Sequence, residues 1–519
     1  MTVKNPLAKY NRSNLIFIGV SIAASLALSA LAEVVIFGLL LSHAPRFYLA
    51  RFLVVAAFLC SLALLIKFRR YFVENLHKAF LLISLVTGIS YVIILPCTLY
   101  ATPDDQIHFV RALALSSESI PASDAFRIVE SNDAAKSVSK LNFIEREEAY
   151  HIINAANQPD TVQIITLGDD TELYQRLAYL PYHLGFKIGS FLHLSFVTTI
   201  MLAKLCNMLC YIALFYFAIK ISQKHLRPIF FATGLIVSCI CIASQFSVDP
   251  MVTAGLSLAL AIFARMLSQP KVDPKLLIAF VFASIWGCLP KAIYCPLILL
   301  PLLIPNKQFD HPKRALAMKL SLVLITVLIA ATFVLPVISG SMTPDVRGGN
   351  TSVSGQLHFL FANPVRVPII VGRSITEAVA PVFLSAESFG NMGYISTGHY
   401  TTAFVGLIQI IILFSTIFTI KLDRKIFTTR LKVCLALAFV VVVGAIVASL
   451  YLSYSQVGAP HASGVQSRYF LPLLPLFALI LAPRGAKTEP YPYATTLVFI
   501  SYCCLALTVA IYVAKYSVM

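Results

Sequence analysis

Residues 433–452 read VCLALAFVVVVGAIVASLYL, an apolar run without a charged side chain. A helix needs about 20 such residues to cross the hydrocarbon layer of a bilayer, which is roughly 30 Å thick. A basic stretch, residues 421–432, precedes this run, and polar residues follow it. The pattern predicts a transmembrane helix whose first end lies in the cytoplasm.

Similar runs occur along the whole chain, which is 58% hydrophobic and 12% charged over 519 residues. A water-soluble protein of this composition would expose large apolar patches, and the strands of a membrane β-barrel would be shorter and would alternate. We therefore predict an all-α, polytopic transmembrane protein. Its thirteen candidate spans are residues 15–41, 48–66, 79–99, 196–219, 229–246, 251–267, 276–289, 292–304, 320–339, 402–420, 433–452, 469–481 and 494–514. Runs 276–289 and 292–304 are short enough to form a re-entrant pair.

The formal charge of +17 comes from small Lys and Arg clusters in every second connection between these runs. This distribution indicates membrane topology and not nucleic-acid binding. It predicts a cytoplasmic N-terminus and an outward C-terminus. We divide the chain into N-terminal helices (1–99), an outward cap (100–195), central helices (196–339), a second outward segment (340–400) and C-terminal helices (401–519).

The cap begins with the most informative motif, TPDDQIHFVR at residues 102–111. If Pro103 opens a helix, Asp104, His108 and Arg111 share one face at the membrane boundary. Asp104 and Asp105 are then candidates for a general base, or for ligands of a divalent cation. The alternative is a well-capped helix start, in which two acids in the first turn only stabilise the helix. Both interpretations stay open at this stage.

Three more charges stand beside apolar runs on the outward side: Asp249, Lys291 and Arg468. Charges at such positions are costly, so each is a candidate site residue. A plain turn is the alternative for Asp249, and snorkelling of the side chain to water is the alternative for Lys291. We interpret Glu33 and Lys204, which lie inside apolar runs, as polar contacts between helices.

Two motifs carry a resemblance to a family of bacterial multi-pass membrane proteins that is classed as a domain of unknown function and is distantly similar to the GT-C glycosyltransferases. The family's outward P-x-D-E-x-x-H-F-x-R-A is matched from Pro103 to Ala112, with Asp105 in place of Glu. Its G-V-Q-G-R-Y-F-L-P is matched from Gly464 to Pro472, with Ser467 in place of Gly. The S-x-D at 247–249 and the K-x-x-Y-x-P at 291–296 are also similar.

The resemblance implies a GT-C-like fold and an inverting transferase that moves a sugar from a polyprenyl-phosphate donor to a lipid-linked glycan acceptor, such as O-antigen, at the outer face of the bacterial inner membrane. It assigns catalysis to Asp104, Asp105 and His108. It assigns contacts with the lipid phosphate to Arg111, Lys291, Tyr294, Arg468 and Tyr469, with Asp249 and Gln466 in support. No cofactor is required by the resemblance, and a divalent cation on the acid pair stays open. The alternatives are a flippase or transporter, and an O-antigen polymerase.

Overall fold

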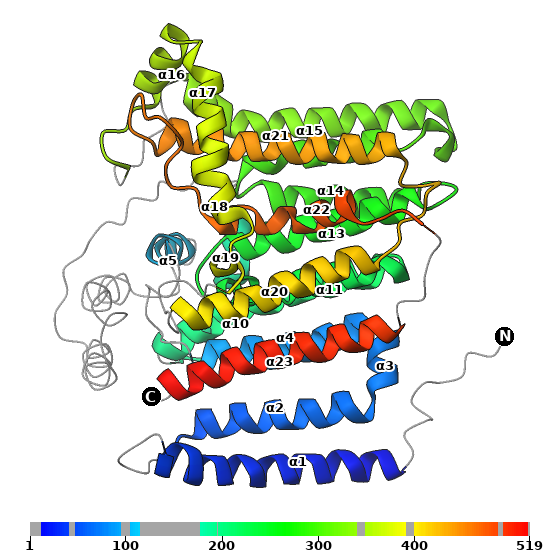
Figure 1. The fold of residues 1–519 in the computed structure, drawn as a ribbon, viewed down its shortest axis with the longest axis vertical. Coiled ribbons are helices and arrows are strands. Elements are labelled where there is room, and N and C mark those ends of the chain that lie inside the picture. The colour runs from blue at the N-terminus through cyan, green and yellow to red at the C-terminus, as the bar shows by residue number, and fades with distance from the viewer. Residues whose placement is uncertain are drawn as a thin grey trace.

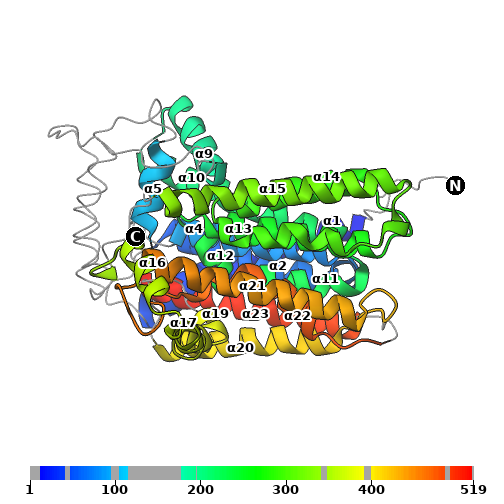
Figure 2. The same ribbon diagram turned by 90° about the horizontal axis from the view of Figure 1, so that it is seen from above.

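The computed structural model describes residues 12–40, 47–94, 104–114, 177–194, 196–339, 348–390, 399–485 and 491–516. Within these ranges the chain is helical, and the β-pairing amounts to one isolated bridge between Leu422 and Arg484. The all-α prediction is therefore confirmed. The long helices lie side by side in a bundle, which Figure 1 shows from the side and Figure 2 from above.

In the described part of the chain, nine helices are long and apolar enough to cross a membrane. They are α1 (Arg12–Ala32) with its continuation η2 (Glu33–Leu40), α2 (Leu49–Lys67), α4 (Leu76–Ile94), α10 (Phe196–Ile221), α13 (Asp249–Leu267), α15 (Pro312–Ser339), α20 (His399–Thr419), α21 (Thr429–Ser453) and α23 (Tyr491–Tyr516).

The remaining apolar runs are helical, but they do not form long, straight spans. Run 229–246 is divided into α11 (Arg227–Gly234) and α12 (Val237–Ala243), which are bent by 64° where they meet. The other three form α14 (Pro274–Cys288), η5 (Ala292–Leu303) and a segment made of η9 (Ser467–Tyr469), η10 (Leu471–Leu473) and α22 (Leu474–Leu481). The prediction of thirteen spans is thus corrected to nine, or ten with the bent pair, among the described residues.

The break between α11 and α12 has a local cause at Gly234. The hydroxyl of Tyr211 donates a hydrogen bond of 2.9 Å to the carbonyl oxygen of Gly234, which therefore has a partner outside its own helix. A Cβ atom at Gly234 would lie only 2.7 Å from the ring of Phe215 and 2.8 Å from that of Phe80. Glycine thus permits close packing at a point where the helix ends.

Shorter helices complete the described fold: α3 (Arg69–Glu74), α5 (Asp105–Ala114), η3 (Leu177–Tyr179), α9 (Leu180–Phe191), η4 (Lys224–Leu226), η6 (Asn306–Gln308), α16 (Val353–Ala362), α17 (Arg366–Arg373), η8 (Ser374–Val379), α18 (Ala380–Phe383) and α19 (Ala386–Gly390). Figure 1 shows α5, α16 and the last turn of α23 at one end of the bundle, and α3 at the other. The start of α1 and the end of α23 lie at opposite ends.

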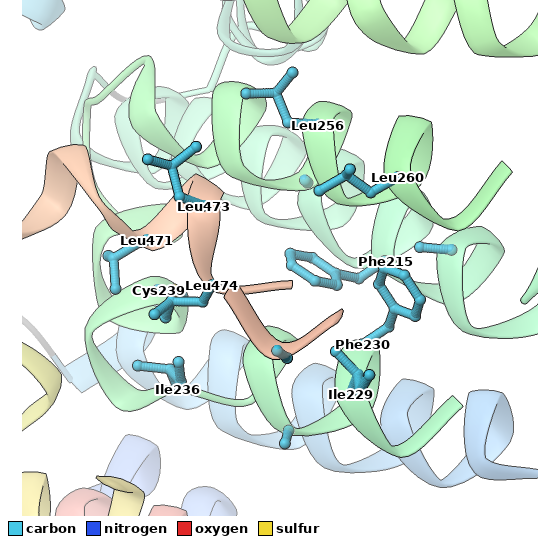
Figure 3. Packing of buried hydrophobic residues seen from close by; sticks show 14 of the residues in the cluster. Phe215, Ile229, Phe230, Ile236, Cys239, Leu256, Leu260, Leu471, Leu473 and Leu474 are labelled. Carbon is cyan, nitrogen blue, oxygen red and sulfur yellow. The ribbon is translucent and has the colours of Figure 1, made fainter. Parts of the chain in front are cut away.

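The core of the bundle encloses the short C-terminal segment. Figure 3 shows side chains of η10 and α22 between side chains of α13 and those of α11 and α12. Leu471, Leu473 and Leu474 are at most 5% exposed. Between helices in a membrane, close van der Waals packing of such side chains stabilises the arrangement. Arg468 directly precedes the segment and is fixed by the same contacts.

Candidate active site

Four charged side chains of alternating sign meet at one end of the bundle. The Nη2 atom of Arg468 forms a close ion pair with Asp104, and its Nη1 atom lies 3.4 Å from Oδ2 of Asp249. The other carboxylate oxygen of Asp249 pairs with the ammonium group of Lys291. We call the series Asp104, Arg468, Asp249, Lys291 the ion-pair chain. It joins α5, η9, α13 and the N-terminal cap of η5.

The inner and outer members of the ion-pair chain differ in exposure. The side chains of Arg468 and Asp249 are 7% and 5% exposed, whereas those of Asp104 and Lys291 are 22% and 20% exposed. A buried charge without a partner is strongly destabilising, and each inner member has an oppositely charged neighbour on both sides. The accessible groups are therefore the carboxylate of Asp104 and the ammonium group of Lys291, at the two ends of the ion-pair chain.

Tyr469 lies beside both cations. Its ring centroid is 4.6 Å from Nζ of Lys291 and 5.4 Å from Cζ of Arg468, which is within the range of cation–π attraction. The hydroxyl of Tyr294, a fully buried side chain, donates a hydrogen bond of 2.7 Å to the carbonyl oxygen of Tyr469. The two tyrosines thus couple η5 to η9 and fix the position of the cations.

The structure corrects the predicted start of the helix that carries the acids. Helix α5 begins at Asp105, and Asp104 precedes it with a φ angle of 66°. The amide of His108 donates to the carbonyl oxygen of Asp104 at 3.0 Å, so Asp104 closes the first turn from outside the helix. A left-handed backbone at a residue other than glycine is uncommon, and it turns the Asp104 side chain toward Arg468. Thr102 and Pro103, the predicted cap and first residue, lie outside the described residues.

The two adjacent carboxylates have different surroundings. Asp105 is 0% exposed, and its Oδ1 atom accepts a hydrogen bond of 2.8 Å from the backbone amide of Phe246. This bond joins α5 to the connection between α12 and α13, next to Asp249. Asp105 therefore holds the motif in place, whereas Asp104 is the accessible acid.

The sequence profile of a family described as a predicted membrane protein (DUF2142) matches residues 85–477 of the chain. The chain belongs to this family. The matched region contains all four members of the ion-pair chain and both motifs of the sequence analysis. No curated protein and no solved structure matches the chain.

In this DUF2142 protein, His108 and Arg111 both form hydrogen bonds with Tyr179. Nδ1 of His108 lies 2.8 Å from the hydroxyl of Tyr179, with which Arg111 also forms a hydrogen bond. Burial lowers the pKa of His108 to about 3, with Arg468 and Lys291 acting in the same direction, and together these effects outweigh the opposite effect of the Asp249 and Asp104 carboxylates. Burial likewise raises the pKa of Tyr179 to about 12. A neutral imidazole of such low basicity positions α5 against η3 and is a poor proton acceptor.

The acid pair does not form a joint metal site in this arrangement, because Asp104 faces Arg468 while Asp105 faces a backbone amide. Among the described residues, no group of three or more His, Cys, Asp or Glu side chains is placed to hold a metal ion.

Sequence reasoning missed the polar groups beneath the site. Tyr182 donates to the carbonyl oxygens of Gln245 at 2.6 Å and Ser247 at 3.0 Å, and its hydroxyl accepts from the Ser247 amide at 2.9 Å. Lys204, on α10, donates to the side chain of Gln245 at 2.6 Å, so its contact is with the connection between α12 and α13 and not with a second helix as predicted. The salt bridge of Glu33 with Arg51, at 2.5 Å, confirms the predicted contact between helices for Glu33. The sequence offered one signal for Tyr182, its spacing of three residues from Tyr179. Buried positions of ordinary helices often have this spacing, so the signal is weak.

Gln466 was predicted to support the contacts with the lipid phosphate. It lies two residues before Arg468, at the N-cap position of η9. Its Oε1 atom is buried and has no hydrogen-bond partner among the described residues. A buried polar oxygen of this kind favours a donor such as a sugar hydroxyl. Most of the predicted cap, residues 115–176, lies outside the described residues.

Proposed function

We propose that this protein is a GT-C-type glycosyltransferase that moves a sugar from a polyprenyl-phosphate carrier to a cell-envelope glycan, such as lipid-linked O-antigen, at the outer face of the bacterial inner membrane. The observation that carries the proposal is the accessible Asp104 carboxylate, held by Arg468 at one end of the helix bundle and linked through Asp249 to the accessible Lys291. A base and two cations at a membrane boundary are what this reaction requires.

In the proposed reaction, Asp104 accepts the proton of an acceptor hydroxyl. The hydroxyl oxygen forms a bond to the anomeric carbon of the donor sugar while the bond from that carbon to the lipid phosphate oxygen breaks. The phosphate leaves with the bonding electrons, and the configuration at the anomeric carbon is inverted. Lys291 and Arg468 stabilise the negative charge that grows on the leaving phosphate, which is the task of preorganised cations at a low-dielectric boundary.

The ion pair with Arg468 keeps Asp104 ionised and weakly basic before the donor arrives. A phosphate that enters beside Lys291 and Arg468 competes with the carboxylates for these cations. Asp104 then becomes a stronger base only when the donor is in place. This coupling limits proton transfer to the loaded site.

The test is transfer of radiolabelled sugar from polyprenyl phosphate to an acceptor glycolipid by the purified protein. We expect Asp104→Asn to lower the rate about 10²–10⁴-fold, the usual contribution of a general base. Asp105→Asn is the matched control, because the side-chain oxygen of the asparagine can still accept the hydrogen bond from the backbone amide of Phe246. We expect this variant to keep most of the activity. Equal rates in Asp104→Asn and wild type would remove Asp104 from catalysis.

A flippase built on the same charges would move the lipid-linked donor between leaflets without forming a glycosidic bond. Reconstituted vesicles separate the two functions. Labelled glycan product supports the transferase, while donor that changes leaflet without product supports the flippase. The proposed orientation, with the N-terminus in the cytoplasm and the C-terminus in the periplasm, places the ion-pair chain in the periplasm.

A further inference from the structure

A second polar site lies at the other end of the bundle. A cavity of about 640 Å³ opens between the last turn of α10, η4, the last turn of α13 and the start of α14. Asp249 is the first residue of α13, and Arg265, which lines the cavity, is in its last turn. At 1.5 Å per residue these positions are about 24 Å apart along the helix, so the cavity is separate from the ion-pair chain.

The cavity has a surplus of positive charge. Lys220, Lys224, Arg227 and Arg265 line it, and among the described residues of its lining the one carboxylate is that of Asp273. Asp273 caps α14 by accepting a hydrogen bond of 2.9 Å from the amide of Lys275. With four cations and this one carboxylate, the described lining carries a net charge of +3.

Arg227 is the least exposed of the four cations, and part of its guanidinium group is buried. The Nε atom of Arg227 is buried and has no hydrogen-bond partner among the described residues, while its Nη2 atom donates to the carbonyl oxygen of Lys220 at 3.4 Å. Leaving a buried donor on a charged group unpaired costs more than about 1–3 kcal/mol. The Nε atom itself is out of reach of solvent, so an anion in the cavity would meet the accessible cationic groups of the lining, which include the exposed Lys220, Lys224 and Arg265.

The walls of the cavity suit a phosphate with an apolar tail. Phe217, 47% exposed, and Leu276 border it on the side of the spanning helices. The side-chain amide of Gln223 donates a hydrogen bond of 3.0 Å to the carbonyl oxygen of Ala264, in the last turn of α13. This donor is therefore already in use. The cationic side chains of the lining are charged donors, and phosphate oxygens are their preferred partners.

We propose that this cavity binds a phosphate group, from the headgroup of an anionic lipid or from a soluble phosphate, at the end of the protein opposite the candidate active site. A lipid would place its chains along Phe217, and a soluble phosphate would need only the cations. The proposal does not depend on the glycosyltransferase activity.

The test measures equilibrium binding to the full chain in a neutral detergent, with two radiolabelled probes. Inorganic phosphate represents the soluble source, and dihexanoyl phosphatidylglycerol represents the lipid. Binding is compared in Arg227→Gln, in Lys224→Gln and in Arg424→Gln, an exposed cation on the loop after α20 that lies outside the cavity. No sugar donor is present, so failure of the transferase proposal would not affect the result.

We expect saturable binding that weakens about tenfold or more in each cavity variant, the effect of one charge-assisted hydrogen bond, and about twofold or less in Arg424→Gln. Binding of phosphatidylglycerol alone assigns the cavity to lipid, and binding of both probes shows that the phosphate group suffices. Lys224 is exposed, so its variant decides the matter if Arg227→Gln does not fold. Absence of saturable binding, or an equal loss in all three variants, would overturn the proposal.

Discussion

The two ends of the helix bundle carry charge in opposite ways. At one end, two acids and two cations alternate in direct contact, and the inner pair is at most 7% exposed. At the other, four cations line a cavity with one carboxylate, and three of them, Lys220, Lys224 and Arg265, are exposed. Balanced charge can be buried, while unbalanced charge has to stay in water or bind a counter-ion. The first end is therefore built to hold a fixed geometry, and the second to attract an anion.

The largest effect on stability is expected at the inner cation. Arg468→Met leaves Asp249 and Asp104 without their shared partner, and we expect the free energy of unfolding to fall by about 3–5 kcal/mol. Thermal unfolding in detergent measures this change. Arg424→Met, which removes an exposed cation, should cost less than about 0.5 kcal/mol.

A second-site variant sharpens this result. In the double variant Arg468→Met, Asp249→Asn, the carboxylate that lost its partner is neutral, so the loss should be smaller than the sum of the two single losses. Additive losses would mean that Arg468 and Asp249 do not interact in the folded protein.

A smaller effect is expected from pH, through His108. Its pKa is about 3 in the folded protein, below the value of about 6.5 in an unfolded chain. Between these values the unfolded state binds more protons, so stability falls as the pH is lowered from about 6.5 toward 3. At pH 5 the loss due to His108 is about 2 kcal/mol. Unfolding of wild type and His108→Gln over this range isolates the contribution, and parallel pH profiles would contradict it.

The smallest effect is expected at Tyr294. Tyr294→Phe removes the hydroxyl that donates to the Tyr469 carbonyl oxygen and keeps the ring, so it should cost about 0.5–1.5 kcal/mol. Transfer activity should fall with it, because Tyr469 positions both cations. Tyr400→Phe, at an exposed tyrosine on α20, is the control for loss of a hydroxyl. If the two variants behave alike, Tyr294 does not support the site.

Hydropathy located the helices well, because each of the thirteen apolar runs is mainly helical over its described residues. It could not give the number of long spans, since the division of run 229–246 depends on a hydrogen bond from Tyr211, in another helix, to Gly234. Prolines inside η5, at positions 296 and 301, similarly make a short, tight helix of an apolar run.

The sequence predicted which charged residues belong to the candidate site, but not which of them contact one another. Asp249, Lys291 and Arg468 were each singled out by a charge beside an apolar run, and Asp104 by its place in the motif at residues 102–111. The separate surroundings of Asp104 and Asp105 were not visible, because the amide that Asp105 accepts from lies 141 residues away along the chain. The partner of Asp104 is 364 residues away. Contacts over such separations follow from the packing of helices and not from local sequence.

In the proposed orientation, the ion-pair chain faces the exterior, and the cavity lined by Lys220, Lys224, Arg227 and Arg265 faces the cytoplasm. Single cysteines at Asn350 and Lys224, in a variant whose native cysteines are replaced by serine, can be labelled in intact cells with a membrane-impermeant maleimide. Asn350 is exposed and lies on the loop that contacts Val457, eleven residues before Arg468. We predict labelling of Asn350→Cys in intact cells, and of Lys224→Cys only after the membrane is opened. Labelling of Lys224→Cys alone in intact cells would place the ion-pair chain in the cytoplasm and contradict the account.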